Sequence, residues 1–332
     1  MTKIVSLLAA LSAMLAQITY ADPAHALNTK SWVTGLGSDS NPCTRPFPCA
    51  TFAHAIQQTS SGGEIGVVDS GEYGGNPTGI DRSISITNDG AGDALFTVGA
   101  NALGLLVLAS AGDVVSLRGL TINGSEAAAI GISYSVAAAL HIQNCVIKNF
   151  EDPQAGTGIQ VPANGTQQMF ISDTLIYNNG GALGDNGVGG GILVSINTTG
   201  TEAIVLDRVH LENNVFGLKV DNSQNTMGNG VHVVVRDSVI SGNAASGIIA
   251  SLAPGAKPVI MFVEHSSIVN NGNNGVLADG QHAVVILNDN TITRNGTGIK
   301  ATNGGQLISY GNNKNNNNVG AEGAPTSTFS QM

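Results

Sequence analysis

The chain of 332 residues carries little charge. Asp, Glu, Lys and Arg together make up 11% of it, and 23 acids against 13 bases leave a formal net charge of −10. Lys and Arg form no cluster, which excludes the basic surface that tracks nucleic-acid phosphates. We therefore expect no nucleic acid among its partners. Aromatic residues make up only 4%, with the single tryptophan Trp32, so few rings are available to stack on sugars.

Proline and long apolar runs are also scarce. Ten prolines beside an apolar fraction of 42% exclude a disordered chain. Beyond residue 26 no stretch of 18 consecutive apolar residues occurs, so we expect no membrane span in the mature chain. Residues 1–26 resemble an export signal, with Lys3 before an apolar run and small-residue cleavage points after Ala21 or Ala26. The mature protein is therefore expected to be secreted or periplasmic.

Only three cysteines are present. Cys43 and Cys49 flank a short proline-containing loop, and in an oxidising compartment this arrangement predicts a disulfide. A zinc site is not expected, because no further ligands follow at metal-binding spacing. Cys145 lies in a strand-like apolar run, which indicates a small buried side chain and not a nucleophile.

Glycine and asparagine are abundant, with 44 and 33 residues. Both are poor helix formers that tolerate positive φ, so they predict turns between short strands. One phrase recurs from Val114 to Asn295: alternating apolar residues around a central Ile or Leu, then Asn or Gly, then Gly before an apolar residue. The central position falls at Ile122, Ile147, Ile176, Leu211, Ile240, Ile268 and Ile292.

Successive central residues are 24 to 35 residues apart, and each interval holds three strand-sized pieces separated by turns. A chain that passes through three sides and returns one strand spacing higher pairs each strand in parallel with its counterpart. The sequence therefore predicts an all-β fold, a single-stranded right-handed parallel β-helix, which is a solenoid of roughly ten coils. Turn asparagines such as Asn214 and Asn243 are expected to hydrogen-bond along the stack.

The predicted organisation follows from these segments. Residues 27–63 form an N-terminal cap with the Cys43 to Cys49 loop and a short helix, on which Phe52, Ala55 and Ile56 share one face. Residues 64–318 form the β-helix, and residues 319–332 form a polar C-terminal tail. Caps are needed because the ends of such a rod expose strand edges and apolar core.

The cap also carries a family resemblance. The stretches Trp32-Val33-Thr34-Gly35, Asn41-Pro42-Cys43, Pro48 to Phe52 and Gly62-Gly63-Glu64-Ile65 resemble the opening of bacterial secreted right-handed β-helix repeat proteins of the pectin-lyase-like superfamily. With the repeats, this resemblance spans nearly the whole mature chain. It implies the fold but no single function, since the superfamily includes lyases, polygalacturonases, epimerases, tailspikes and adhesins. The Asn-Thr-Asp, Asp-Asp, Gly-His-Gly and Arg-x-Lys segments of polygalacturonases are absent, as are the pectate-lyase signatures.

One outward column of the predicted helix carries the candidate site. Lys148, Tyr177 and Glu212 follow the central position in consecutive coils, and His210 directly precedes Leu211. The turn beyond carries the acids Glu126, Glu151, Asp152 and Asp185, which are expected at one corner. There Glu151, Asp152 and Asp185 would hold Ca²⁺, the one cofactor that the sequence suggests. The alternative is a solvated face on which a few acids happen to stack.

Three functions fit this pattern. The leading hypothesis is non-enzymatic binding of an extracellular polysaccharide or cell-surface ligand, contacted by Glu212 and the acids. The second is a polysaccharide lyase or related enzyme, in which Ca²⁺ neutralises a uronate carboxylate and Lys148, Tyr177 or His210 is the catalytic base. The third is a structural or adhesin surface module.

An outward apolar stripe bears on the oligomeric state. It consists of Phe170, Val205, Val234, Phe262 and Ile286. Either neighbouring loops fold over this stripe, or it is an interface. The chain is therefore expected to be a monomer or a homotrimer.

Overall fold

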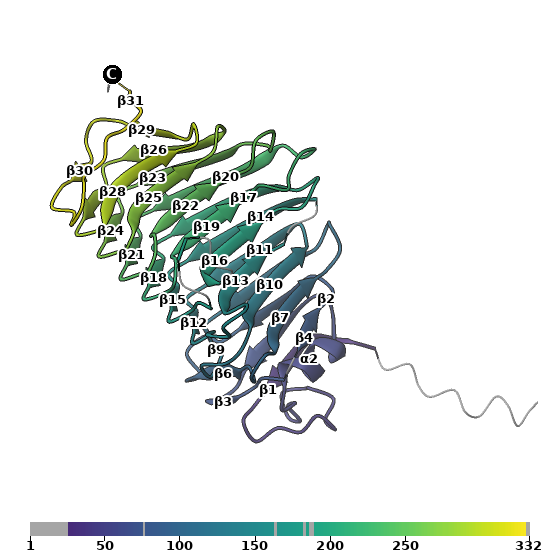
Figure 1. Cartoon of the computed structure of the whole chain (residues 1–332). Helices are drawn as coiled ribbons and strands as arrows, with labels where there is room; N and C mark the ends of the chain where they lie inside the picture. The colour runs from purple at the N-terminus through teal and green to yellow at the C-terminus, as the bar shows by residue number, and fades with distance from the viewer. Residues whose placement is uncertain (1–25, 76, 163–164, 182–183, 186–188, 330–332) are drawn as a thin grey trace, which may run out of the picture.

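The computed structural model of the chain describes residues 26–75, 77–162, 165–181, 184–185 and 189–329. Nearly all of the expected export signal therefore lies outside the described residues. The chain winds through three parallel sheets as a rod of stacked coils, from the helix α2 (Phe52–Gln58) at one end to the C-terminal strand β31 (Ser327–Thr328) at the other (Figure 1). The predicted all-β parallel β-helix with a short cap helix is confirmed.

Each complete coil gives one strand to each sheet in turn. Sheet I has twelve strands: β1 (Asn28–Val33), β2 (Thr59–Val67), β5 (Ile84–Thr87), β8 (Val114–Arg118), β11 (Ala139–Gln143), β14 (Thr166–Ser172), β17 (Thr201–Asp207), β20 (Gly230–Arg236), β23 (Val259–Glu264), β26 (Ala283–Asn288), β29 (Gln306–Ser309) and β31. Sheet II has ten: β3 (Gly71–Glu72), β6 (Ala94–Thr97), β9 (Leu120–Asn123), β12 (Val146–Lys148), β15 (Leu175–Tyr177), β18 (His210–Glu212), β21 (Val239–Ser241), β24 (Ser267–Val269), β27 (Thr291–Thr293) and β30 (Lys314–Asn315). Sheet III has nine: β4 (Thr78–Ile80), β7 (Leu103–Leu108), β10 (Ile130–Val136), β13 (Thr157–Val161), β16 (Gly190–Ser195), β19 (Leu218–Asp221), β22 (Ile248–Ser251), β25 (Asn274–Asp279) and β28 (Thr297–Thr302).

Parallel pairing in register stacks equivalent residues into columns. In sheet II, for example, Ile147 pairs with Ile122 on one side and with Ile176 on the other. All seven central residues of the repeat are at most 1% exposed. Because burying one such side chain contributes about 1.5–3 kcal/mol, this column is a main part of the core.

A ladder of asparagine side chains runs inside the corner between sheets II and III. Its members are Asn179, Asn214, Asn243, Asn271, Asn295 and Asn318. In the rung at Asn271, Oδ1 accepts the backbone N–H of Asn243 at 3.2 Å, and Nδ2 donates to Asn295 Oδ1 at 2.8 Å and to the carbonyl of Ile240 at 3.2 Å. The predicted stacking of asparagines is confirmed, and these bonds satisfy backbone groups that the turn leaves without a strand partner.

A column of glycines follows the ladder at the start of sheet III. It consists of Gly131, Gly158, Gly191, Gly217, Gly247 and Gly275. None of these has a left-handed backbone. The reason for glycine is close approach, because a Cβ on Gly217 would lie 2.6 Å from the carbonyl oxygen of Gly247 and 2.8 Å from Ile240 Cγ2.

The N-terminal cap covers the first coil. Helix α2 buries Phe52, Ala55 and Ile56, as its spacing predicted, and the Cys43–Cys49 disulfide closes the loop before it. The boundary at residue 64 differs, since β1 pairs with β2 and β2 begins at Thr59. The sequence concealed this strand because Gly62 has a left-handed φ of 78° and the register shifts beside it, which looks like a turn in sequence.

Asp69 links the cap loop to the first coil through hydrogen bonds. Its Oδ2 accepts from Thr34 Oγ1 at 2.6 Å, and its Oδ1 accepts from the backbone N–H of Gly35 at 2.8 Å. The hydrogen bond from Thr34, followed by that from Gly35, holds the pKa of Asp69 below its usual value. The ionised carboxylate therefore adds stability above the unfolded pKa, near 4, and this stability is lost as the pH falls through the folded pKa.

Asp69→Asn should therefore lower the thermal unfolding midpoint at neutral pH, and its deficit against the wild type should shrink as the pH approaches about 3. Thermal unfolding followed by circular dichroism across this range measures both midpoints. A deficit that stays constant with pH would contradict the role given to the ionised carboxylate.

The C-terminal tail lies along the last coil for as far as it is described. The backbone N–H of Val319 donates to the backbone carbonyl of Asn295 at 2.7 Å, and β31 pairs with β29. Asn313 and Asn318 receive hydrogen bonds from the preceding coil, so the asparagine-rich segment ends the stack with the same bonds that the repeats use. Residues 330–332 of the expected tail lie outside the described residues.

The apolar stripe lies on the outer face of sheet I. Its members are register partners on successive strands, and His141 stacks on Phe170 with ring centres 4.8 Å apart. The side chains are half-buried, so the neighbouring loops do not enclose them. A trimer interface stays a prediction. Across the described ranges, no helix has the length and apolar character to cross a membrane.

Candidate functional site

The outer face of sheet II brings together the four side chains that the sequence singled out. Lys148, Tyr177 and Glu212 are register partners on β12, β15 and β18, one strand spacing apart. Lys148 Nζ lies 5.8 Å from the centre of the Tyr177 ring. His210 points to the same side as Glu212, two residues away, and its Nδ1 lies 2.8 Å from Glu212 Oε1. We call the outward residue that ends each of these strands, from Asn123 to Thr293, the C-face column.

The predicted acids lie in turns between sheets II and III, as expected, but no three of their carboxylates converge in the described part of the chain. Asp152 is buried and its Oδ1 accepts the backbone N–H of Gln154 at 2.8 Å, whereas Glu126 is exposed on an earlier coil. Asp185 reaches later coils, where its Oδ1 accepts from the backbone N–H of Ser246 at 2.8 Å and its Oδ2 accepts from Asn274 Nδ2 at 3.3 Å. Asp185 reaches past the adjacent coil because it belongs to an insertion whose path the repeat does not determine.

Among the described residues, the acids predicted to bind calcium therefore do not form a converged set of carboxylate ligands. Within the described ranges, the one group of three His, Cys, Asp or Glu side chains close enough to share an ion is Cys43, Cys49 and His54. Two of these form the disulfide, so they are not available as thiolate ligands. Cys145 is buried as expected, and burial raises the pKa of its thiol to about 11, which leaves it unreactive.

A second column beside the C-face column was not predicted. It consists of the residue that follows the C-face residue on each strand from β12 to β27, together with Asn317 in the last coil: Asn149, Asn178, Asn213, Gly242, Asn270, Arg294 and Asn317. We call it the corner row. All seven have a left-handed backbone, with φ between 52° and 66°. The backbone N–H groups from Asn149 to Arg294 each donate to the next coil, as Asn270 does to the carbonyl of Thr293 at 3.2 Å, so the same turn recurs.

This turn explains both the residue type and the direction of the side chains. Asparagine is among the few residues other than glycine that adopt a left-handed backbone readily. In the pair Asn270-Asn271, only Asn271 is inside the rod, in the ladder, while Asn270 is exposed. The doubled asparagines are the signal of this outward column in the sequence, but the turn alone already accounts for both members of each pair.

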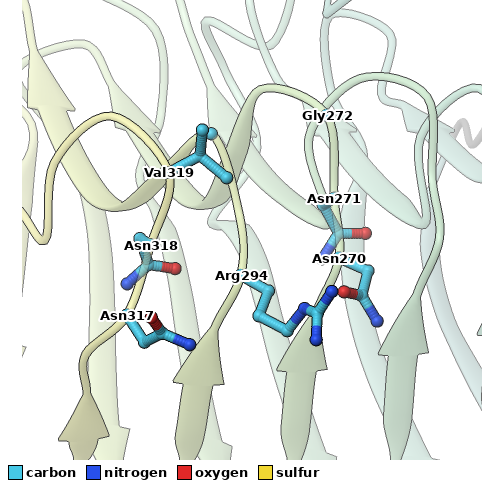
Figure 2. Close-up of a pocket in the computed structure, with 8 residues that line it drawn as sticks. Asn270, Asn271, Gly272, Arg294, Asn317, Asn318 and Val319 are labelled. Atoms are coloured by element: carbon cyan, nitrogen blue, oxygen red, sulfur yellow. The ribbon is translucent and has the colours of Figure 1, made fainter.

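Two hollows lie along the corner row. The larger, of about 680 Å³, is lined by Asn270, Asn271, Gly272, Arg294, Gly296, Asn317, Asn318 and Val319. Figure 2 shows the Arg294 side chain extending towards Asn270, with Asn317 on the other side. The smaller, of about 200 Å³, is lined by Glu151, Asn178, Asn179, Gly180, Asn213, Asn214, Val215 and Ala244.

The chemistry of this surface is that of hydrogen bonding. A carboxamide donates two hydrogen bonds and accepts two, and a guanidinium donates five and carries a charge. Arg294 is exposed, and its guanidinium forms no ion pair with any described side chain. We call the C-face column and the corner row together the strip; it runs along the rod over seven coils and presents a polar side chain on almost every one.

The fold and the strip define a parallel β-helix with one elongated polar surface. The family model described as right-handed β-helix region matches residues 103–282, more than half of the chain. The chain belongs to this right-handed β-helix family. No curated protein matches it.

Two solved structures share the fold. Pectate lyase Pel9A has a TM-score of 0.61 and 14% sequence identity, over 93% of this chain and 80% of that chain. A rhamnogalacturonan lyase has a TM-score of 0.52 and 16% identity, over 85% of this chain and 75% of that chain. At these identities the similarity establishes a pectin-lyase-like fold and no activity.

Proposed function

We propose that this chain binds an extended polysaccharide lengthwise on the strip. The observation that carries the proposal is the corner row, whose seven places follow one another at one strand spacing; five of them carry a carboxamide, four of these carboxamides are exposed, and a sixth place carries the exposed Arg294. Each carboxamide donates and accepts, as neighbouring sugar hydroxyls do. The strand spacing of about 4.8 Å is close to the advance of one sugar ring in an extended chain, so successive rings meet successive coils.

The composition of the strip indicates how it binds. Tyr177 is the single aromatic side chain among the residues of the strip, so affinity depends on hydrogen bonds more than on stacking. Lys148 and Arg294 place positive charge towards opposite ends of the strip, where they suit acidic groups on a polymer. The two structural neighbours are named as lyases of pectate and rhamnogalacturonan, which makes acidic plant polysaccharides the first ligands to test. The disulfide supports a location outside the cytoplasm.

The test is binding of the mature protein to a panel of pectins, alginates and glycosaminoglycans by affinity electrophoresis and calorimetry. Asn270→Gly removes one carboxamide while keeping the left-handed backbone, and we expect it to weaken binding about 2- to 10-fold. Arg294→Asn also suits the left-handed backbone, and for an acidic polymer we expect a loss of about tenfold or more.

Asn144→Gly is the matched control. Asn144 also has a left-handed backbone, with φ of 51°, and is exposed, but it lies at the corner between sheets I and II. It should leave binding unchanged. Equal weakening by Asn144→Gly and Asn270→Gly would contradict binding on the strip, and no binding to any polymer by the wild type would favour a structural or adhesin module.

Lyase activity is the second candidate, supported by the grouping of Lys148, Tyr177 and His210 on one face. The same incubations distinguish it from binding. Absorbance from unsaturated uronides that disappears with Lys148→Ala would establish the enzyme, with that amine as a base.

A further inference from the structure

A carboxyl group is buried inside the rod, away from the strip. Glu202 lies on β17 at an inward position, in alternation with Ile204 and Leu206, which are also buried. Its side chain is 0% exposed. Neither of its carboxylate oxygens has a hydrogen-bond partner among the described residues. An unpaired carboxylate in such a place is costly, because nothing replaces the water that it loses.

Two buried carboxamides share this deficiency. Gln167 Nε2 donates to the carbonyl of Ser135 at 2.6 Å, and Asn222 Nδ2 donates to the carbonyl of Lys257 at 2.7 Å. The oxygens of both side chains have no partner in the described part of the chain. Together with Glu202 they make four buried side-chain atoms without a partner, and all four are oxygens. These oxygens therefore lack either a hydrogen-bond donor or a cation.

The three side chains lie at one corner, where the chain passes from sheet III to sheet I. Gln167 and Glu202 are register partners near the starts of β14 and β17, and Val231 follows Glu202 in the same column. Asn222 comes directly after β19, and its Nδ2 lies 3.5 Å from the carbonyl oxygen of Pro258. That oxygen accepts the backbone N–H of Val231 at 3.0 Å, which places Asn222 beside the column that contains Glu202.

A proton alone does not satisfy this corner. Burial raises the pKa of Glu202 to about 8, so without a bound ion the group would be neutral at pH 7. Burial, and after it the charge of Glu202, raise the pKa of Tyr134, whose hydroxyl donates to the carbonyl of Gln168 at 3.0 Å. A protonated Glu202 donates one hydrogen bond and so serves one further oxygen, which leaves two of the four without a partner.

We propose that Glu202, Gln167 and Asn222 bind a monovalent cation of the sodium or potassium type inside the rod. Carboxylate and carboxamide oxygens are the ligands that hard cations prefer. The single negative charge of Glu202 balances one positive charge, whereas a divalent ion would leave a net charge buried among apolar side chains. The ion links coils that otherwise meet at this corner through strand pairing, apolar contact and the hydrogen bonds of Gln167 and Asn222.

The experiment is thermal unfolding of the mature protein at neutral pH in sodium, potassium or tetramethylammonium chloride at one ionic strength. Because a ligand that binds only the folded state stabilises it, the wild-type midpoint should rise by about 2–4 °C or more in saturating sodium or potassium over tetramethylammonium. Glu202→Gln keeps the shape of the side chain and removes the charge, so its midpoint should no longer depend on the cation. Glu64→Gln is the control, since Glu64 is a solvent-accessible carboxylate on β2 of the same sheet, and should respond as the wild type does.

Other outcomes overturn the proposal. If the wild-type midpoint does not depend on the cation but falls as the pH rises from about 4 to about 8 and levels off above, the occupant is a proton on Glu202. If calcium chloride, added as a further salt at the same ionic strength, is the one salt that raises the midpoint, the site binds a divalent ion. An equal response to sodium or potassium in wild type and Glu202→Gln means that the ion binds elsewhere. Anomalous scattering from thallium soaked into crystals gives an independent readout, and the proposal requires a peak beside Glu202.

Discussion

Replacing Asn271 with leucine is expected to lower the free energy of unfolding by about 3–6 kcal/mol. Leucine has the same number and branching of side-chain heavy atoms, but it cannot hydrogen-bond with either neighbour in the ladder. The backbone N–H of Asn243 and one proton of its side chain would lose their acceptor, and the carbonyl of Ile240 would lose a donor. Each of these groups is buried, so water does not replace the lost partner. Equilibrium unfolding in urea measures the difference.

Asn316→Leu is the control for this prediction. Asn316 belongs to the same asparagine-rich class, but it is exposed and no hydrogen bond of its side chain holds a neighbouring coil. Its substitution should change the free energy of unfolding by no more than about 0.5 kcal/mol. If Asn271→Leu were equally mild, the ladder would be a consequence of the fold and not one of its causes.

Gly217→Val is expected to destabilise the protein by about 3 kcal/mol or more, or to prevent folding. A Cβ at this position would lie 2.6 Å from the carbonyl oxygen of Gly247, and the coils cannot separate without breaking the strand pairs on each side. Soluble yield and the urea midpoint of the purified variant measure the effect.

The matched control is Gly79→Val. Gly79 is also a strand glycine of sheet III, on β4, but a Cβ there would meet nothing within 4 Å. Valine also favours the extended backbone, so Gly79→Val should be neutral or slightly stabilising. Equal damage at both positions would mean that glycine is needed for its flexibility, contrary to the close approach seen at Gly217.

Features that repeat were predictable from sequence. The buried Ile240, the inward Asn243 and the closely approached Gly247 each belong to a position that recurs in successive coils. Because parallel pairing stacks equivalent positions, the role predicted for one of them applies to its whole column. The same logic predicts Lys148, Tyr177 and Glu212 on one face, and their register confirms it.

Features outside the repeat were not predictable. Asp185 lies in an insertion, and its contacts with Ser246 and Asn274 span 61 and 89 residues of sequence. Gln167 and Glu202 occupy an inward position that Val231 fills in the next coil, and such departures from an apolar column are not visible without the register. The corner row was not predictable as a binding surface for another reason. Its asparagines suit a left-handed backbone, and this requirement of the turn already explains why they are there.

The corner row also bears on how the proposed binding surface can change in evolution. Each place in the row comes with one repeat of 24 to 35 residues, which brings its own strands, ladder asparagine and turn. Duplication or loss of one such unit in a gene would lengthen or shorten the row by one place and leave the remaining places in phase. Ligand length can therefore be selected through copy number, while ligand chemistry is selected independently through single substitutions such as arginine for asparagine at position 294.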